Sequence, residues 1–264
     1  MINKTLVQKR FSKQATSYDE YAIVQKQMAD HLLAQLTCHS FPKNVSILEI
    51  GCGTGFLTEK LCAAFPHAGI VAVDLAPGMI QQAKTRFLHS GVTFQCGDIE
   101  RMNFSTSFDI IVSNATFQWF NHVDQTLQML MNAVKPTGML AFSTFGEKTF
   151  HEMHTSYEAV NASLDEESSP PSQRFLSYAE LETLCQNVKQ GSYKLRESFA
   201  VEQFSSVRDF LRSLQKIGAT NSNERSMSPG ALKSMMRHYE ERFTDQNAIE
   251  ATYHCLFAFL TRAT

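Results

Sequence analysis

The residues best suited to chemistry in this chain are glycines placed at the end of an apolar run. The run ends at Ile50 and is followed at once by Gly51 and Gly53. Gly55 then opens a helical pattern, whose first turn offers free N–H groups to a ligand. Glycines here let a ligand approach the backbone and let the helix pack closely. Asp74 ends the next apolar run about 20 residues later, where a carboxylate can bind both ribose hydroxyls. The spacing predicts a site for an adenosine-containing cofactor, and a solvated acid at a strand end is the alternative for Asp74.

Short runs rich in valine and isoleucine must position these residues. They alternate with helical patterns, which is typical of βαβ units whose helices join parallel strands. The alternation predicts a doubly wound α/β fold with a mostly parallel sheet. We expect strands near residues 45–50, 70–74, 92–95, 109–114, 138–143, 193–200 and 253–262.

The length of 264 residues suits one large α/β domain with an inserted lid. We therefore expect residues 1–264 to form a single domain, with residues 45–144 as its cofactor-binding core. Helical spacing over residues 1–40 predicts an N-terminal helical lid over the open edge of the cofactor site. Weaker periodicity over residues 145–190 predicts an inserted substrate lid, and residues 191–264 supply the C-terminal strands and helices.

The composition argues against several classes of partner. A formal charge of -2 gives no basic excess for binding nucleic acid. No apolar run approaches the roughly 20 residues that span a bilayer, and the N-terminus shows no apolar signal segment. We therefore expect a cytoplasmic protein with no nucleic-acid and no membrane partner. Its cysteines are dispersed without any C-x-x-C pair, which indicates reduced thiols: Cys38, Cys52, Cys62, Cys96, Cys185 and Cys255.

The segment Glu49-Ile-Gly-Cys-Gly-Thr-Gly55 lacks the G-x-G-x-x-G order of a pyrophosphate clamp. It resembles motif I of the class I S-adenosylmethionine-dependent methyltransferases. The resemblance implies a Rossmann-like, seven-stranded sheet, S-adenosylmethionine as cofactor, S-adenosylhomocysteine as product, and no metal. It also implies that Asp98 faces the adenine amino group, and a turn or helix-cap carboxylate is the alternative. The cofactor-binding residues that it implies are Tyr18, Glu49, Gly51, Cys52, Gly53, Gly55, Asp74, Leu75, Met79, Asp98, Ile99 and Asn114.

Other segments narrow the resemblance to one family. The N-terminal pattern from Val7 to Asp19, the stretch from Ser113 to Trp119 and the stretch from Phe142 to Met153 are similar to the malonyl-acyl carrier protein O-methyltransferases of biotin synthesis. Arg174-Phe175-Leu176 resembles a lid segment of the same family. The resemblance implies methyl transfer to the free carboxylate of malonyl-phosphopantetheine on acyl carrier protein, with malonyl-CoA as a further candidate substrate.

Four residues are predicted to act on the acceptor. A carboxylate with a pKa near 4 is already ionised at neutral pH, so the reaction needs no general base. Arg174 can hold that carboxylate with its guanidinium fork. Alternatively, it can form a salt bridge within the lid, to Asp165, Glu166 or Glu167. Tyr18 can hydrogen-bond the cofactor or the carboxylate, or it can simply pack. Gln118, with Trp119 and Phe120, is expected at the methyl-transfer end.

His151 matches the family pattern and is expected to line the substrate pocket. Its H-x-x-H spacing with His154 invites a metal interpretation, but no carboxylate or cysteine cluster completes such a site. We therefore expect no metal there.

Basic residues recur every four positions at Arg208, Arg212 and Lys216, opposite an apolar face. The pattern predicts a helix whose basic stripe could steer an acidic carrier protein, or one that is merely solvated. Two alternatives to the leading function also stay open. One is a methyltransferase for another small carboxylic acid, and the other is a non-catalytic cofactor-binding assembly factor.

Overall fold

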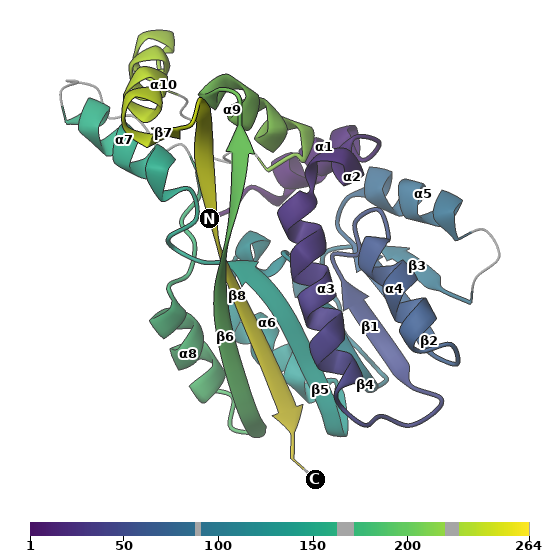
Figure 1. Ribbon diagram of the computed structural model, residues 1–264. Coiled ribbons are helices and arrows are strands. Elements are labelled where there is room, and N and C mark those ends of the chain that lie inside the picture. The colour runs from purple at the N-terminus through teal and green to yellow at the C-terminus, as the bar shows by residue number, and fades with distance from the viewer. Residues whose placement is uncertain (88–90, 163–171, 220–226, 264) are drawn as a thin grey trace.

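Figure 1 shows the protein, a computed structural model, as a twisted sheet with helices on both faces. The structure describes residues 1–87, 91–162, 172–219 and 227–263. Within these residues the sheet has the strand order β3-β2-β1-β4-β5-β8-β6, and a short β7 pairs with β8. The strands are Ser46–Ile50 (β1), Gly69–Asp74 (β2), Thr93–Cys96 (β3), Phe108–Ser113 (β4), Val134–Phe145 (β5), Gly191–Phe204 (β6), Thr244–Asp245 (β7) and Ala248–Arg262 (β8).

The first five strands are parallel, and β8 enters antiparallel between β5 and β6. The predicted doubly wound α/β fold is therefore confirmed, with the two-residue β7 added to the seven expected strands. Both late strands are longer than predicted. The register of β5 ends with Phe145 opposite Cys255, but β8 continues to pair with β6 as far as Ile249 opposite Phe204. These extra residues stabilise each other as a two-stranded ribbon beyond the end of β5.

The helices cover both faces of the sheet. On one face α3 buries Leu32 and Leu36, and on the other α6 buries Leu127 and Leu130. The helices are Lys4–Gln14 (α1), Tyr18–Tyr21 (α2), Ile23–Thr37 (α3), Phe56–Ala64 (α4), Pro77–Arg86 (α5), Val123–Asn132 (α6), His151–Asn161 (α7), Tyr178–Gln186 (α8), Val207–Lys216 (α9) and Pro229–Phe243 (α10), with the short 3-10 turns Ile99–Arg101 (η1) and Phe117–Trp119 (η2).

Five of these helices, which we call the cap, gather at the top of Figure 1, at the carboxyl ends of the parallel strands: α1, α2, α7, α9 and α10. The ribbon of β6 and β8 reaches into the cap, because α9 directly follows β6 and α10 leads through β7 into β8. The side of α7 packs against α10. The cap is thus built from the N-terminal segment and from segments after β5.

The segment from 145 to 190, predicted as one substrate lid, is divided in the structure. Its α7 belongs to the cap, whereas α8 packs against β6 and β8 and fully buries Leu181 and Cys185. Asp165, Glu166 and Glu167 lie outside the described residues. A lid function for this segment stays a prediction.

None of the helices in the described part of the chain combines the length and the apolar character needed to span a bilayer. All six cysteines are free thiols, and three of them are buried.

Candidate functional site

A cavity of about 680 Å³ opens between the carboxyl ends of β1, β2 and β4 and the helices α1 and α2. The strand order reverses between β1 and β4, and ligands of open α/β sheets bind at such a switch point. The cavity is lined by Lys4, Val7, Gln8, Phe11, Tyr18, Ile50, Gly51, Gly53, Val73, Asp74, Leu75, Ala76, Met79, Gly97, Asp98, Ile99, Asn114, Ala115, Thr116, Trp119 and Phe120.

The glycine loop forms the floor of this cavity. Gly51 and Gly53 both have positive φ values, 69° and 56°, which side chains disfavour. A Cβ on Gly51 would overlap the side chain of Thr116, whereas one on Gly53 would meet no atom within 4 Å. Gly51 is therefore required by packing inside the protein. Gly53 keeps open space at the cavity, as a close-lying ligand requires.

Asp74 is fixed by the loops on either side of it. Its Oδ2 accepts the Gly53 N–H at 2.9 Å, and its Oδ1 accepts the Ala76 N–H at 2.7 Å. Burial raises the pKa of this carboxyl to about 6, although both hydrogen bonds favour the ionised form. The carboxylate is thus oriented before any ligand arrives and is ionised at neutral pH.

Tyr18 closes the cavity from α2. Burial, reinforced by the nearby carboxylates of Asp74 and Asp19, raises the pKa of its phenol far above the ordinary value. The hydroxyl is therefore protonated at every physiological pH and can donate a hydrogen bond. Asp19 itself is held by Thr54 Oγ1 at 2.5 Å and by Arg86 at 2.6 Å, which ties α2 to the glycine loop and to α5.

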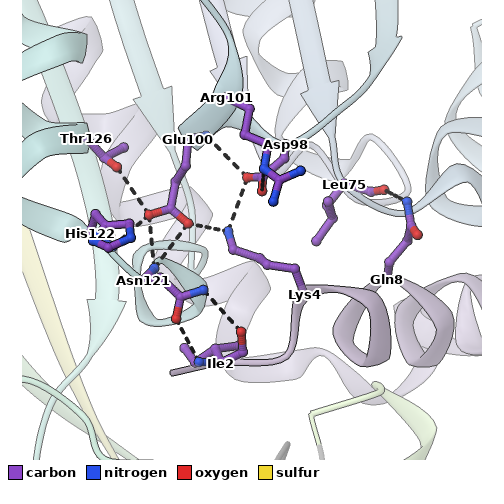
Figure 2. Close-up of polar contacts among 10 residues, drawn as sticks. All are labelled: Ile2, Lys4, Gln8, Leu75, Asp98, Glu100, Arg101, Asn121, His122 and Thr126. Carbon is purple, nitrogen blue, oxygen red and sulfur yellow. Dashed lines mark hydrogen bonds and ion pairs between the residues drawn. The ribbon is translucent and has the colours of Figure 1, made fainter.

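The side chain of Lys4 connects α1 to the cofactor loops (Figure 2). Its Nζ lies 2.6 Å from Glu100 Oε2 and 3.2 Å from Asp98 Oδ1. Asp98 also accepts the Glu100 N–H at 3.2 Å, so it both caps η1 and lines the cavity. The two roles considered for Asp98 in the sequence are therefore compatible.

Two further contacts hold α1 in place. The backbone of Ile2 exchanges hydrogen bonds with the side chain of Asn121, at 2.7 and 3.1 Å, and Gln8 donates to the Leu75 carbonyl at 2.9 Å (Figure 2). The sequence analysis missed Lys4 and Gln8. Their spacing with Phe11, which places all three on one face of a helix, was the signal available.

An aromatic wall lies at the other side of the cavity. The ring of Phe11 meets Trp119 edge-on at 5.4 Å and lies 6.3 Å from the ring of Tyr18. Phe120 also lines the cavity, and Lys4 Nζ lies 5.2 Å from its ring centre. Trp119 and Phe120 are therefore wall residues, as predicted, and Phe120 is largely buried as well.

Three predicted cofactor residues lie behind the cavity wall instead of lining it. Glu49 is 1% exposed and accepts a hydrogen bond from Thr58 Oγ1 at 2.6 Å. Burial raises the pKa of this carboxyl to about 8, so it is largely protonated at neutral pH. Cys52 packs with buried apolar residues of β2 and α5, and Gly55 has φ 91° and faces the ring of Phe87. These residues support the loop, and direct contact with a cofactor stays a prediction.

The other predicted cofactor residues do line the cavity. Asn114 is the most constrained, because its Nδ2 donates to the Gln25 carbonyl at 2.9 Å and its Oδ1 accepts from Ser143 Oγ at 2.7 Å. The full set at the cavity is Tyr18, Gly51, Gly53, Asp74, Leu75, Met79, Asp98, Ile99 and Asn114.

Three residues predicted to act on the acceptor lie outside the lining of this cavity. Gln118 donates to the Ala115 carbonyl at 2.6 Å, directly behind the wall. Arg174, 73% exposed, pairs with Glu180 at the start of α8. His151 is 52% exposed. Their roles toward an acceptor stay predictions.

The second histidine of the H-x-x-H pair on α7, His154, is engaged within the protein. His154 contacts Ser172 Oγ at 2.8 Å through its Nε2, and burial lowers the pKa of its ring. Among the residues that the structure describes, no group of three metal-ligating side chains converges.

Comparison with known proteins defines the class first. A family model described as a methyltransferase domain matches residues 47–138. The solved plantazolicin methyltransferase BpumL, in complex with a triazolic desmethylPZN analog and SAH, is similar with a TM-score of 0.57 and 20% identity, covering 99% of this chain and 96% of that chain. The fold is that of a methyltransferase, and the matched residues 47–138 include the glycine loop, Asp74 and Asp98.

Full-length relatives then give the family. The malonyl-[acyl-carrier protein] O-methyltransferase of Bacillus anthracis is 46% identical over 266 residues, which cover 99% of this chain and 98% of the relative. The protein of the same name from Acetivibrio thermocellus is 44% identical over 265 residues, or 97% of this chain and 93% of the relative. The chain belongs to the malonyl-[acyl-carrier protein] O-methyltransferase family, which confirms the resemblance found in the sequence.

Proposed function

We propose that this protein transfers a methyl group from S-adenosylmethionine to the free carboxylate of malonyl-acyl carrier protein. The products are S-adenosylhomocysteine and a methyl ester that serves as the primer for the pimeloyl part of biotin. The observation that carries the proposal is full-length membership of a family with this name, together with the cavity built around Asp74.

The cavity fits such a cofactor. Gly53 leaves the floor open, and the oriented carboxylate of Asp74 can accept both ribose hydroxyls. Asp98 also lines the cavity, and its carboxylate can accept the adenine amino group. When bound, the cofactor supplies an electrophilic methyl group on a sulfonium. Nothing in this chemistry requires a metal.

The residues at the cavity suit an acceptor that is already a nucleophile. A malonyl carboxylate is ionised at neutral pH, so the protein needs to hold it without protonating it. The Tyr18 hydroxyl is a donor that stays protonated, and it lies between the glycine loop and the aromatic wall. Alignment of carboxylate oxygen, methyl carbon and sulfur is then the main source of rate, and positioning can supply up to about 7–11 kcal/mol.

The cap also shields the reaction from water. Phe11, Trp119 and Phe120 present apolar surface to the cavity, and α1 is held over it by Lys4. Cancellation of a carboxylate charge against a sulfonium charge is more favourable in such a dry environment. In this proposal Gln118, His151 and Arg174 contribute from the acceptor side, and Arg174 must exchange Glu180 for the malonyl carboxylate. Malonyl-CoA, which shares the thioester and the pantetheine arm, is a secondary substrate, and the reaction takes place in the cytoplasm.

Release of S-adenosylhomocysteine with different acceptors tests the proposal. We expect release with malonyl-acyl carrier protein and none above background with acetyl-acyl carrier protein, which lacks the free carboxylate. A strong preference for a free acid, such as a trans-aconitate-like tricarboxylate, would instead indicate a methyltransferase for small carboxylic acids. Tight cofactor binding without release for any acceptor would indicate a non-catalytic assembly factor.

A further inference from the structure

The exposed face of α9 carries the basic stripe seen in the sequence. Arg208, Arg212 and Lys216 are all exposed, whereas Val207, Phe210 and other apolar residues of the helix are buried. The apolar face fixes α9 in the cap. Its basic face is therefore not needed for packing.

Helix α1 brings further basic residues to the same part of the cap. Lys9 and Lys13 are exposed and one helical turn apart, opposite the side of α1 that lines the cavity. The C-terminal end of α9 lies against the middle of α1 and the turn before α2. Ser17 Oγ donates to the Lys216 carbonyl at 3.1 Å, and a Cβ on Gly218 would lie 3.2 Å from the backbone carbon of Arg10. The exposed faces of α1 and α9 are thus parts of one surface, which we call the basic cap surface: Lys9, Lys13, Arg208, Arg212 and Lys216.

The charge of this surface contrasts with that of the whole chain. The chain has a formal charge of -2, but α1 contains no acidic residue. On α9 the single acid is Asp209. Its carboxylate accepts hydrogen bonds from the hydroxyls of Ser205 and Ser206 and forms an ion pair with Arg212. The nearby acids of α2 are Asp19, which is paired with Arg86, and the exposed Glu20. A positive field therefore remains concentrated over the cap.

Helix α1 separates this surface from the cavity, because it presents Lys4, Gln8 and Phe11 to the cavity and Lys9 and Lys13 to solvent. We propose that the basic cap surface is the docking site for the acidic carrier protein, which would lay a negatively charged helix across α1 and α9. The proposal rests on the proposed function, because only a protein-borne malonyl group needs such a surface. An arm attached at the docked helix would then enter the cavity along the edge of α1.

Charge complementarity at such a rim acts mainly on encounter and apparent affinity, and it weakens as salt screens the charges. The chemical step lies inside the cavity and is unaffected. The signature of the docking site is therefore a change in KM for the carrier-bound substrate at low ionic strength, without a change in kcat.

The test uses the full-length double variant Arg208→Glu/Lys216→Glu, which reverses two exposed charges that the structure does not use in packing. The matched control is Lys189→Glu/Lys194→Glu, which makes the same charge change near the start of β6, at the opposite end of the sheet in Figure 1. We expect KM for malonyl-acyl carrier protein at low salt to rise about tenfold in the first variant and less than twofold in the control, with the difference shrinking as salt is added.

Malonyl-pantetheine, which keeps the malonyl carboxylate but lacks the carrier protein and its charges, separates this proposal from the proposed function. Equal KM for malonyl-pantetheine in wild type and both variants, with the rise confined to the carrier substrate, supports the docking site. An unchanged KM for the carrier substrate, or an equal rise in the control variant, overturns it and leaves the methyl transfer intact. Absence of methyl transfer to both malonyl thioesters in the wild type overturns the proposed function and the docking site together.

Discussion

The cofactor loops and the residues predicted to act on the acceptor are held in place differently. The carboxylate of Asp74 is buried and accepts two backbone N–H groups from residues close to it in its own and the neighbouring loop. On the side predicted to hold the acceptor, Arg174 lies in the loop before α8, is largely exposed, and pairs with Glu180 of that helix. Exposed ion pairs contribute only about 0–1 kcal/mol, whereas hydrogen bonds to a buried charge contribute more. The cofactor side is therefore preorganised, and the acceptor side can adapt to its substrate.

Removal of the Asp74 carboxylate should weaken cofactor binding more than any of the other substitutions below. Asp74→Ala leaves the Gly53 and Ala76 N–H groups without their acceptor and removes the acceptor for the ribose hydroxyls. Two charge-assisted hydrogen bonds correspond to about 3–5 kcal/mol, so we expect Kd for S-adenosylhomocysteine to rise at least ~100-fold by calorimetry. Asp124→Ala, an exposed acid on α6, is the control. A change below tenfold in Asp74→Ala would show that the cofactor side is not organised around this residue.

Substitution of Glu49 tests whether its buried carboxyl, which supports the glycine loop, is uncharged at neutral pH. The pKa of the Glu49 carboxyl is raised to about 8 in the folded protein, compared with about 4.3 in the unfolded chain. Its contribution to the free energy of unfolding is therefore fully present below about pH 4.3 and is lost as the pH rises through 8. Glu49→Gln removes the charge that the wild type must bury at pH 9. We expect its Tm to exceed that of the wild type by roughly 5 °C at pH 9 and by much less at pH 6. Exposed Glu59→Gln is the control, and a pH-independent difference would contradict the assignment.

The pH dependence of cofactor binding should follow Asp74. Its pKa of about 6 is that of the free protein, and the ionised form is the one that accepts ribose hydroxyls. Affinity for S-adenosylhomocysteine should therefore be constant above pH 7 and fall about tenfold between pH 7 and pH 5. Asp74→Asn should bind weakly at all pH values with no such slope. A slope that persists in this variant would assign the titration to another group.

Lys4 tests whether the cap contributes to cofactor binding, because it belongs to α1 of the cap but contacts Asp98 and Glu100 of the cofactor loops. Lys4→Met removes the links to Asp98 and Glu100 while keeping the side-chain volume, and we expect Kd for S-adenosylhomocysteine to rise roughly fivefold. Lys4→Arg should restore most of the affinity, and exposed Lys43→Met should have no effect. Equal affinity in Lys4→Met and wild type would show that α1 covers the cavity without contributing to cofactor binding.

The same contrast explains which features could be predicted from the sequence. Strand ends and tight turns follow local rules, and Gly51, Gly53, Asp74 and Asp98, which were singled out in this way, lie together at one cavity. Lys4 and Gln8 were missed because their contacts, to Asp98 and Leu75, span about 70 to 90 residues of chain. The extra length of β6 and β8 was missed because most of those residues pair with each other or with β7, beyond the end of β5. The family resemblance pointed to Arg174 and His151, but a resemblance carries no information about which direction a side chain takes.

The transfer of a labelled methyl group tests the central claim most directly. The purified protein is incubated with methyl-labelled S-adenosylmethionine and either malonyl- or acetyl-acyl carrier protein, and base-labile label on the carrier is measured. We predict label on the malonyl carrier alone, released by base as expected of an ester. Label on both carriers, or none on the malonyl carrier while S-adenosylhomocysteine still binds, would contradict the assignment of the free carboxylate as the methyl acceptor.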